Sequence, residues 1–248
     1  ELGGGRAYNL IPNLGVLASK NINFSQSNII GGPESLKGTG WTVAAIFGSL
    51  SGIPLSIPIY DNCYSGMGTF APGATSLGDI LKSNGYSLTF LMGSDATFGG
   101  RKDFLQLHGD FDVLDYDKAV EEGVIPHGYH VWWGYEDKYL YSYAKDTLLK
   151  LQREDAPFCF MMLTADTHHI GGYVCSECSN KFSIQFENVI SCADTQIANF
   201  IDWIEQQDFY DNTTVVILGD HCSMDPSYFK DLAEGYVRRP YNVFINSY

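Results

Sequence analysis

Short apolar segments alternate along the chain with segments of helical periodicity, and this alternation most constrains the fold. Strands are expected at residues 21–30, 86–92, 111–116, 157–166, 213–220 and 241–247. Helices are expected at residues 11–20, 41–50, 75–85, 137–154 and 186–206. Several strands are unbroken apolar runs, which are typical of parallel strands covered on both faces. The pattern predicts an α/β fold with a mostly parallel central sheet and helices on both faces.

Length and charge narrow the class of protein further. The 248 residues, 45% of them hydrophobic, are enough for one domain, expected to span residues 1–248. The formal net charge of −14 repels polyanions and argues against a nucleic-acid partner. No segment reaches the eighteen or so apolar residues that a membrane-spanning helix needs.

Both ends of the chain resemble the boundaries of a fragment. The N-terminus begins with a glycine-rich stretch at residues 3–5, and no strand precedes the first expected helix. The C-terminus ends on the apolar segment 241–247. We therefore expect a catalytic-domain fragment that lacks its first strand and its C-terminal part.

Three of the six cysteines, Cys175, Cys178 and Cys192, form the tightest group in the sequence. Such a group is compatible with a zinc site or with a disulfide. The segment between Cys178 and Cys192 contains no histidine to complete a zinc site. A disulfide from Cys192 to Cys175 or Cys178 is favoured, and it would place the domain outside the reducing cytosol.

Polar residues at the carboxyl ends of strands are the first candidates for a site, because ligands bind there in open α/β sheets. Asp220 and His221 follow the strand at 213–220 and offer an oxygen and a nitrogen ligand to Mn²⁺, Mg²⁺ or Zn²⁺. The alternative is that Asp220 caps the next helix and His221 packs in the interior.

Thr39 precedes the helix expected at 41–50, and helix N-termini attract phosphate or sulfate. A nearby metal ion would lower the pKa of its hydroxyl and make it a nucleophile. The alternative role is an ordinary helix cap. Thr42 is expected one turn inside the helix, where it would bond a backbone carbonyl.

Other candidates follow two of the strands. His168 or His169 could protonate a leaving oxygen, with only one of them facing the site. Arg101 could clamp a phosphate, or lie on the surface beside Asp103. The pair at 132–133, two tryptophans, could line a sugar or lipid-headgroup pocket, although aromatic pairs are more often core.

Four motifs in chain order resemble the phosphoglycerol transferases of the alkaline phosphatase and sulfatase superfamily, which include lipoteichoic acid synthase. They are GTGWT (38–42), SGIPL (51–55), TADTHHIGGY (164–173) and NTTVVILGDHCSM (212–224). The resemblance covers nearly the whole chain and is nearest to the transferases that decorate periplasmic glucans. It implies an alkaline phosphatase-like fold.

The resemblance also implies a reaction. A threonine takes a phosphoglycerol group from phosphatidylglycerol, releases diacylglycerol, and passes the group to a hydroxyl of a glycan or polymer. Thr39 matches this nucleophile and is also a metal ligand, together with Asp220 and His221. His168 matches the histidine beside the transferred group, and Arg101 falls where relatives carry a basic residue for phosphoglycerol. One divalent ion, Mn²⁺ or Mg²⁺, is implied.

The family's fourth metal ligand is a glutamate after the first strand, and it has no match here. Glu1 lies beside the glycine turn, and Glu34-Ser35-Leu36 lies too near Thr39. The ligand and the membrane anchor of the relatives are expected in segments outside this chain. The implied location is the extracellular face of a bacterial cytoplasmic membrane, or the periplasm.

Related activities remain as alternatives. They are a phosphoethanolamine transferase, a sulfatase, a phosphodiesterase, or a non-catalytic module that binds a glycan or headgroup. A sulfatase normally carries a Cys/Ser-x-Pro-x-Arg motif, which is absent at residues 38–42.

Overall fold

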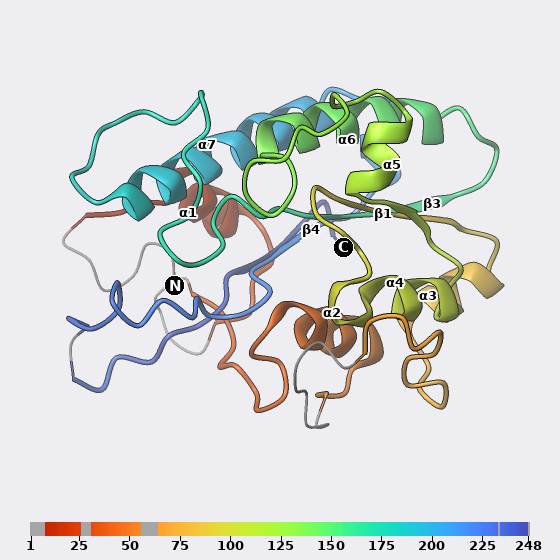
Figure 1. The fold of residues 1–248 in the computed structure, drawn as a ribbon, viewed down its shortest axis with the longest axis horizontal. Helices are drawn as coiled ribbons and strands as arrows, with labels where there is room; N and C mark the ends of the chain where they lie inside the picture. The colour runs from red at the N-terminus through yellow and green to blue at the C-terminus, as the bar shows by residue number, and fades with distance from the viewer. Residues whose placement is uncertain (1–7, 26–30, 56–63, 233, 248) are drawn as a thin grey trace. The chain divides into compact units, whose positions relative to one another are not determined.

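A computed structural model describes residues 8–25, 31–55, 64–232 and 234–247. The chain divides into two compact units (Figure 1). Unit 1 combines residues 1–36 with residues 166–248, and unit 2 is the continuous segment 37–165. We describe each unit by itself.

Unit 2 contains a parallel sheet of three strands in the order β2-β1-β3. The strands are β1 (Ser87–Met92), β2 (Asp112–Leu114) and β3 (Phe158–Leu163). Phe90 at the centre of β1 pairs with Val113 on one side and with Met161 on the other. This sheet confirms the α/β fold predicted from the apolar segments.

Helices cover both faces of this sheet (Figure 1). One face carries α2 (Thr42–Ser51), α3 (Leu77–Ser83) and α4 (Arg101–Leu107), and the other carries α5 (Tyr116–Glu121) and α6 (Asp137–Leu151). A 3-10 turn at Phe98–Gly100 leads into α4.

The core of unit 2 lies between its sheet and the helices α2 and α4. Phe47, Phe70 and Phe104 are each at most 2% exposed. The ring of Phe104 lies 5.4 Å from the rings of both Phe47 and Phe70, between centroids. Such aromatic contacts add to the free energy gained by burying the rings, and they fix α2 and α4 together.

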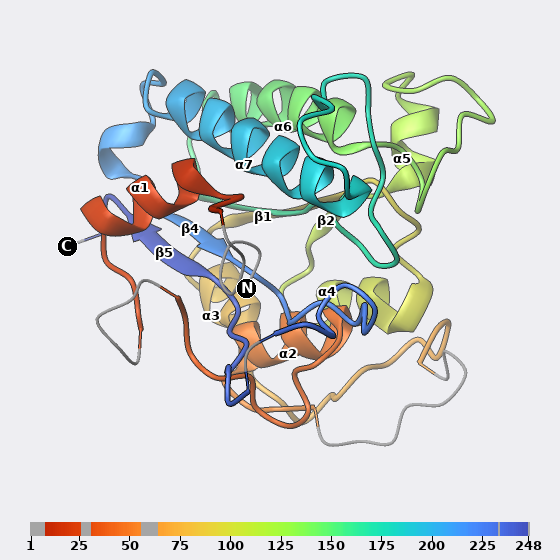
Figure 2. The ribbon, with the colours of Figure 1, turned by 90° about the vertical axis from the view of Figure 1, so that its left-hand side faces the viewer.

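Unit 1 contains α1 (Pro12–Lys20), α7 (Gln185–Ile204), a 3-10 turn at Tyr210–Asn212, and the antiparallel strands β4 (Val215–Leu218) and β5 (Asn242–Ile245). Helix α1 packs against α7 and β5 (Figure 2). The carboxylate of Asp194 on α7 accepts the backbone N–H groups of Asn13 and Leu14, at 3.1 and 2.8 Å. A residue from a distant part of the sequence therefore satisfies the first amides of α1.

Some expected elements differ from the structure. The strand expected at 21–30 is, in its described residues, an extended segment with a single bridge from Ile22 to Phe244, and residues 26–30 lie outside the described part. Helices α4 and α5 were not predicted. Thr42 is the first residue of α2, and the prediction that it lies one turn inside was wrong. None of the helices within the described residues has both the length and the apolar character needed to cross a bilayer.

Candidate active site

Asp220 and His221 follow β4 in unit 1, where the backbone of Gly219 still pairs with Tyr241. Oδ2 of Asp220 lies 3.3 Å from Nε2 of His221. Nδ1 of His221 lies 3.0 Å from the carbonyl oxygen of Cys222. A carbonyl oxygen only accepts hydrogen bonds, so Nδ1 carries a hydrogen, and Nε2 is the ring nitrogen that faces the Asp220 carboxylate, where a proton or a metal ion can bind.

This donor pair fits a divalent cation. One carboxylate oxygen and one imidazole nitrogen converge from adjacent residues, and a backbone carbonyl holds the ring in the tautomer that a metal ligand requires. Mn²⁺, Mg²⁺ and Zn²⁺ all accept such ligands. Asp220 caps no helix, since none follows it within the described residues.

His168 lies in the loop between β3 and α7, also in unit 1. Its Nδ1 lies 2.7 Å from the carbonyl oxygen of His169, so the same argument places its lone pair at Nε2. Burial lowers the pKa of His168, and the neighbouring imidazoles of His169 and His221 lower it further. Asp220 also acts on this ring electrostatically. The structure thus brings His168 into the electrostatic reach of Asp220 and His221.

Thr39 belongs to unit 2 and is half-buried in the turn that precedes α2. The capping position of α2 is Trp41, so Thr39 lies two residues before it. A Cβ built on Gly48 would lie 3.2 Å from the Thr39 Cγ2 methyl group. Because Gly48 has no side chain, this methyl group can lie close to the helix.

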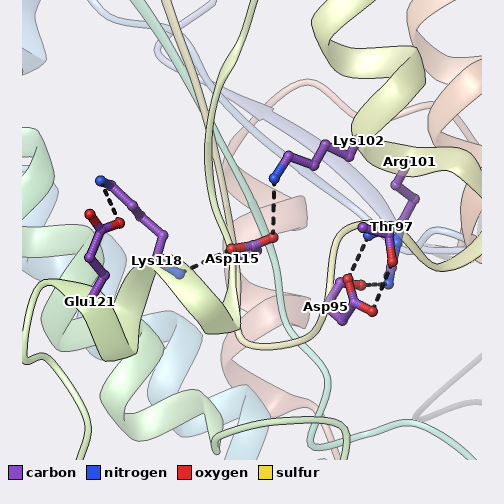
Figure 3. Close-up of polar contacts among 7 residues, drawn as sticks. All are labelled: Asp95, Thr97, Arg101, Lys102, Asp115, Lys118 and Glu121. Carbon is purple, nitrogen blue, oxygen red and sulfur yellow. Dashed lines mark hydrogen bonds and ion pairs between the residues drawn. The ribbon is translucent and has the colours of Figure 1, made fainter. Parts of the chain in front are cut away.

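Arg101 is the first residue of α4 in unit 2 and is only 7% exposed. Its guanidinium donates to the backbone carbonyl of Asp95 (Figure 3). The same guanidinium lies over the ring of Phe98, with its Cζ 5.8 Å from the ring centroid. Burial lowers the pKa of Arg101, and the charges of Asp95 and Asp115 oppose this effect. Arg101 is therefore buried, with its guanidinium fixed by the carbonyl of Asp95, and it is not a surface side chain.

The two tryptophans at 132–133 lie beside the carboxyl ends of unit 2 strands. Trp132 donates from Nε1 to the carbonyl of Ala165, just beyond β3, at 3.0 Å. Trp133 is 43% exposed, and its ring lies 6.2 Å from that of Phe98, between centroids. Trp132 thus anchors the loop, while Trp133 presents its ring to solvent.

The three expected cysteine partners come together in unit 1, but they are free thiols. The Sγ atoms of Cys175 and Cys178 are 3.6 Å apart, whereas a disulfide requires about 2.05 Å. The expected disulfide from Cys192 to Cys175 or Cys178 is thus not formed in the structure. Cys63 lies outside the described residues.

Sequence reasoning missed Arg238. Its guanidinium donates to the carbonyl of Ser223, two residues after His221, and lies over the ring of Phe229 at 3.9 Å. It places a positive charge beside the segment that carries the candidate metal ligands. The only sequence signal was the adjacent pair Arg238-Arg239. The guanidinium of Arg239 lies 3.5 Å from the carboxylate of Glu34, the glutamate that the sequence analysis rejected as a metal ligand.

The family model for sulfatases, described as "Sulfatase", matches residues 4–242 of this chain. Phosphoglycerol transferase I of Xanthomonas axonopodis pv. citri is 34% identical over 244 residues, which are 95% of this chain and 34% of that protein. Phosphoglycerol transferase I of Escherichia coli O127:H6 is 32% identical over 230 residues, which are 90% of this chain and 29% of that protein. The chain spans about a third of the length of these curated relatives.

Solved structures share the fold. The lipoteichoic acid synthase LtaP from Listeria monocytogenes aligns with a TM-score of 0.70 and 19% identity, over 96% of this chain and 59% of that one. The Streptococcus pyogenes phosphoglycerol transferase GacH, in complex with sn-glycerol-1-phosphate, aligns with a TM-score of 0.57 and 15% identity, over 96% of this chain and 61% of that one. The resemblance to phosphoglycerol transferases is confirmed, and the chain belongs to the sulfatase family of the alkaline phosphatase superfamily.

Proposed function

We propose that this chain is the catalytic part of a transferase that moves a phosphoglycerol group from phosphatidylglycerol to a hydroxyl of a glycan or cell-envelope polymer. The observation that carries the proposal is 34% identity to a phosphoglycerol transferase I over 95% of the chain. The convergence of Asp220 with His221 supplies the chemistry that such a reaction needs.

Thr39 is the proposed nucleophile. Its Oγ1 attacks phosphorus, the bond from phosphorus to the diacylglycerol oxygen breaks, and the proton released by the threonine hydroxyl ends on that departing oxygen. Diacylglycerol is released, and the phosphoglycerol group stays on Thr39. Support comes from its position in the GTGWT motif, two residues before the capping position of α2. In the same proposal, Arg101 contacts the phosphoglycerol group with its guanidinium fixed by Asp95.

Asp220 and His221, together with Thr39, are the proposed ligands of one divalent ion, Mn²⁺ or Mg²⁺. When bound, such an ion polarises phosphoryl oxygens and lowers the pKa of a coordinated hydroxyl. The geometry of His221 supports this role, because Nδ1 faces a backbone carbonyl and Nε2, the nitrogen left for a metal ion, lies 3.3 Å from the Asp220 carboxylate.

His168 is proposed to act in the second transfer. The neutral ring accepts at Nε2 the proton of the acceptor hydroxyl, as that oxygen bonds to phosphorus and the bond from phosphorus to Thr39 breaks. Donation to a leaving oxygen, the role expected from the sequence, requires an imidazolium, and burial of His168 disfavours that form.

The donor places this chemistry at a membrane. We propose that the enzyme acts at the extracellular face of a bacterial cytoplasmic membrane or in the periplasm, and that segments outside this chain anchor it there.

The full-length protein that contains this chain should release diacylglycerol from phosphatidylglycerol vesicles when Mn²⁺ and an oligosaccharide acceptor are present, and should label the acceptor with phosphoglycerol. Parallel assays with phosphatidylethanolamine vesicles, sulfate esters and phosphodiesters test the alternative activities. Preferred turnover of any of these would contradict the proposal. Binding of glycerol phosphate without turnover of any donor would favour a non-catalytic module.

The pH dependence of transfer tests the role of His168. Burial lowers its pKa from the ordinary value of 6.5, so the neutral ring is present at neutral pH, and the fall of transfer at acidic pH should have its midpoint below 6.5. His168→Gln should slow transfer roughly 100-fold or more and remove this acidic limb. His169→Gln, which changes the adjacent imidazole and keeps the backbone carbonyl, is the matched control. An acidic limb that persists in His168→Gln would exclude His168 as the titrating base.

A further inference from the structure

Three cysteine side chains in unit 1 converge on one point. Cys175 and Cys178 lie in the loop between β3 and α7, and Cys192 lies on α7. Their Sγ atoms are all within 4.8 Å of one another. The backbone N–H of Cys178 donates to the carbonyl of Cys175 at 3.2 Å, which closes the Cys-Ser-Glu-Cys segment into a turn.

The spacing of the sulfur atoms matches a metal site. In a tetrahedral zinc site with Zn–S bonds of about 2.3 Å, neighbouring sulfur atoms are about 3.8 Å apart. The Sγ atoms of Cys175 and Cys178 are 3.6 Å apart. A disulfide would bring two sulfur atoms to about 2.05 Å. The cluster thus has room for an ion at its centre.

The surroundings suit thiolate ligands. Gln196, one turn after Cys192 on α7, points its side-chain amide at the cluster, with Nε2 3.7 Å from Sγ of Cys175 and 3.0 Å from Oε2 of Glu177. An amide that donates to a ligating sulfur is a common outer contact of metal sites. Cys175 and Cys192 are 4% and 8% exposed, while Cys178 is half-buried. The site is therefore sheltered on two sides and reachable at the third ligand.

We propose that Cys175, Cys178 and Cys192 bind one Zn²⁺ ion as thiolates, with a fourth ligand from solvent. Binding displaces one proton from each thiol, so affinity should rise with pH. The ion would connect Cys192 on α7 to two positions of the preceding loop, Cys175 and Cys178. Residues 164–184 contain no helix or strand, and they carry His168. The zinc ion thus has a structural role, and it is separate from the proposed ion at Asp220 and His221.

Metal and thiol analysis of the full chain, purified with zinc and without reductant, tests the proposal. Zinc is measured by elemental mass spectrometry, and thiols are counted after denaturation in chelator. We expect about one zinc per chain that Cys192→Ser lacks and Cys159→Ala, a cysteine of β3, retains. With Co²⁺ in place of zinc, a thiolate-to-cobalt charge-transfer band should appear in the wild type and in Asp220→Asn, but not in Cys192→Ser.

Two results would overturn the proposal. The first is a disulfide among these three residues, identified by peptide mapping, with no bound zinc. The second is three reduced thiols that bind neither ion. Cys178→Ser, a change at the half-buried position, provides a second variant if Cys192→Ser fails to fold, as judged by circular dichroism. These readouts do not depend on transfer, so the zinc site and the proposed function can fail separately.

Discussion

Thr39→Ala should lower phosphoglycerol transfer by at least about a thousandfold in the full-length enzyme, because it removes the proposed nucleophile. The fold should persist. Thr39 is not at the capping position of α2, and alanine keeps its Cβ while removing the hydroxyl and the methyl group that lies near Gly48. The measurement is transfer from phosphatidylglycerol, with circular dichroism to verify folding.

Thr42→Ala is the matched control, since it removes a second threonine hydroxyl three residues further on, at the first position of α2. It should retain transfer within a few-fold. A direct test is mass spectrometry of enzyme stopped during turnover, which should find a phosphoglycerol adduct on Thr39. Transfer at the wild-type rate by Thr39→Ala would remove Thr39 from the mechanism.

Asp220→Asn should abolish metal-dependent transfer, with a loss of about 100-fold or more that added Mn²⁺ restores only in part. The amide keeps an oxygen that can accept the backbone N–H of His221, now at 2.9 Å, so local structure should survive. The substitution removes the negative charge that a divalent ion requires. Transfer is measured across a Mn²⁺ titration, alongside calorimetric binding of Mn²⁺.

Asp202→Asn is the control for a general change in charge, because Asp202 is exposed on α7 in the same unit. It should leave both the Mn²⁺ dependence and the rate unchanged. If Asp220→Asn bound Mn²⁺ and transferred as the wild type does, Asp220 would not be a ligand.

The sequence predicts the long elements of this fold because their patterns are unambiguous. The apolar run in β3 and the periodicity of α7 each match one type of element. Helix α5 is short and follows β2 with a single intervening residue, Asp115, so the strand expected at 111–116 included its first residue, Tyr116, and the rest of the helix was not predicted. The one local signal was Asp115 itself, whose side chain accepts the N–H of Lys118 as a helix cap.

Only part of the chemistry of the site can be predicted from the sequence. The motifs indicate Asp220, His221 and His168 by residue type and position. In both histidines Nδ1 faces a backbone carbonyl oxygen, that of Cys222 or of His169, so Nε2 is the nitrogen left for the site. The direction of a backbone carbonyl cannot be predicted from residue types. The cysteine cluster also could not be interpreted correctly from the sequence. The spacing of the three cysteines along the chain favoured a disulfide, whereas the Sγ atoms of Cys175 and Cys178 are 3.6 Å apart in the structure.

The capping of α1 by Asp194 has a consequence for synthesis on the ribosome. Unit 2 is one continuous segment, so it can begin to fold once residue 165 has left the exit tunnel. Helix α1 emerges before unit 2, but its packing partners, α7 and β5, are synthesised at least 165 residues later. The same holds for Asp194 on α7, whose carboxylate binds the first amides of α1. Until then the segment around α1 cannot pack, and Leu14 and other apolar residues that the folded protein buries stay exposed to solvent. We expect a chaperone that binds nascent chains to act mainly during this interval.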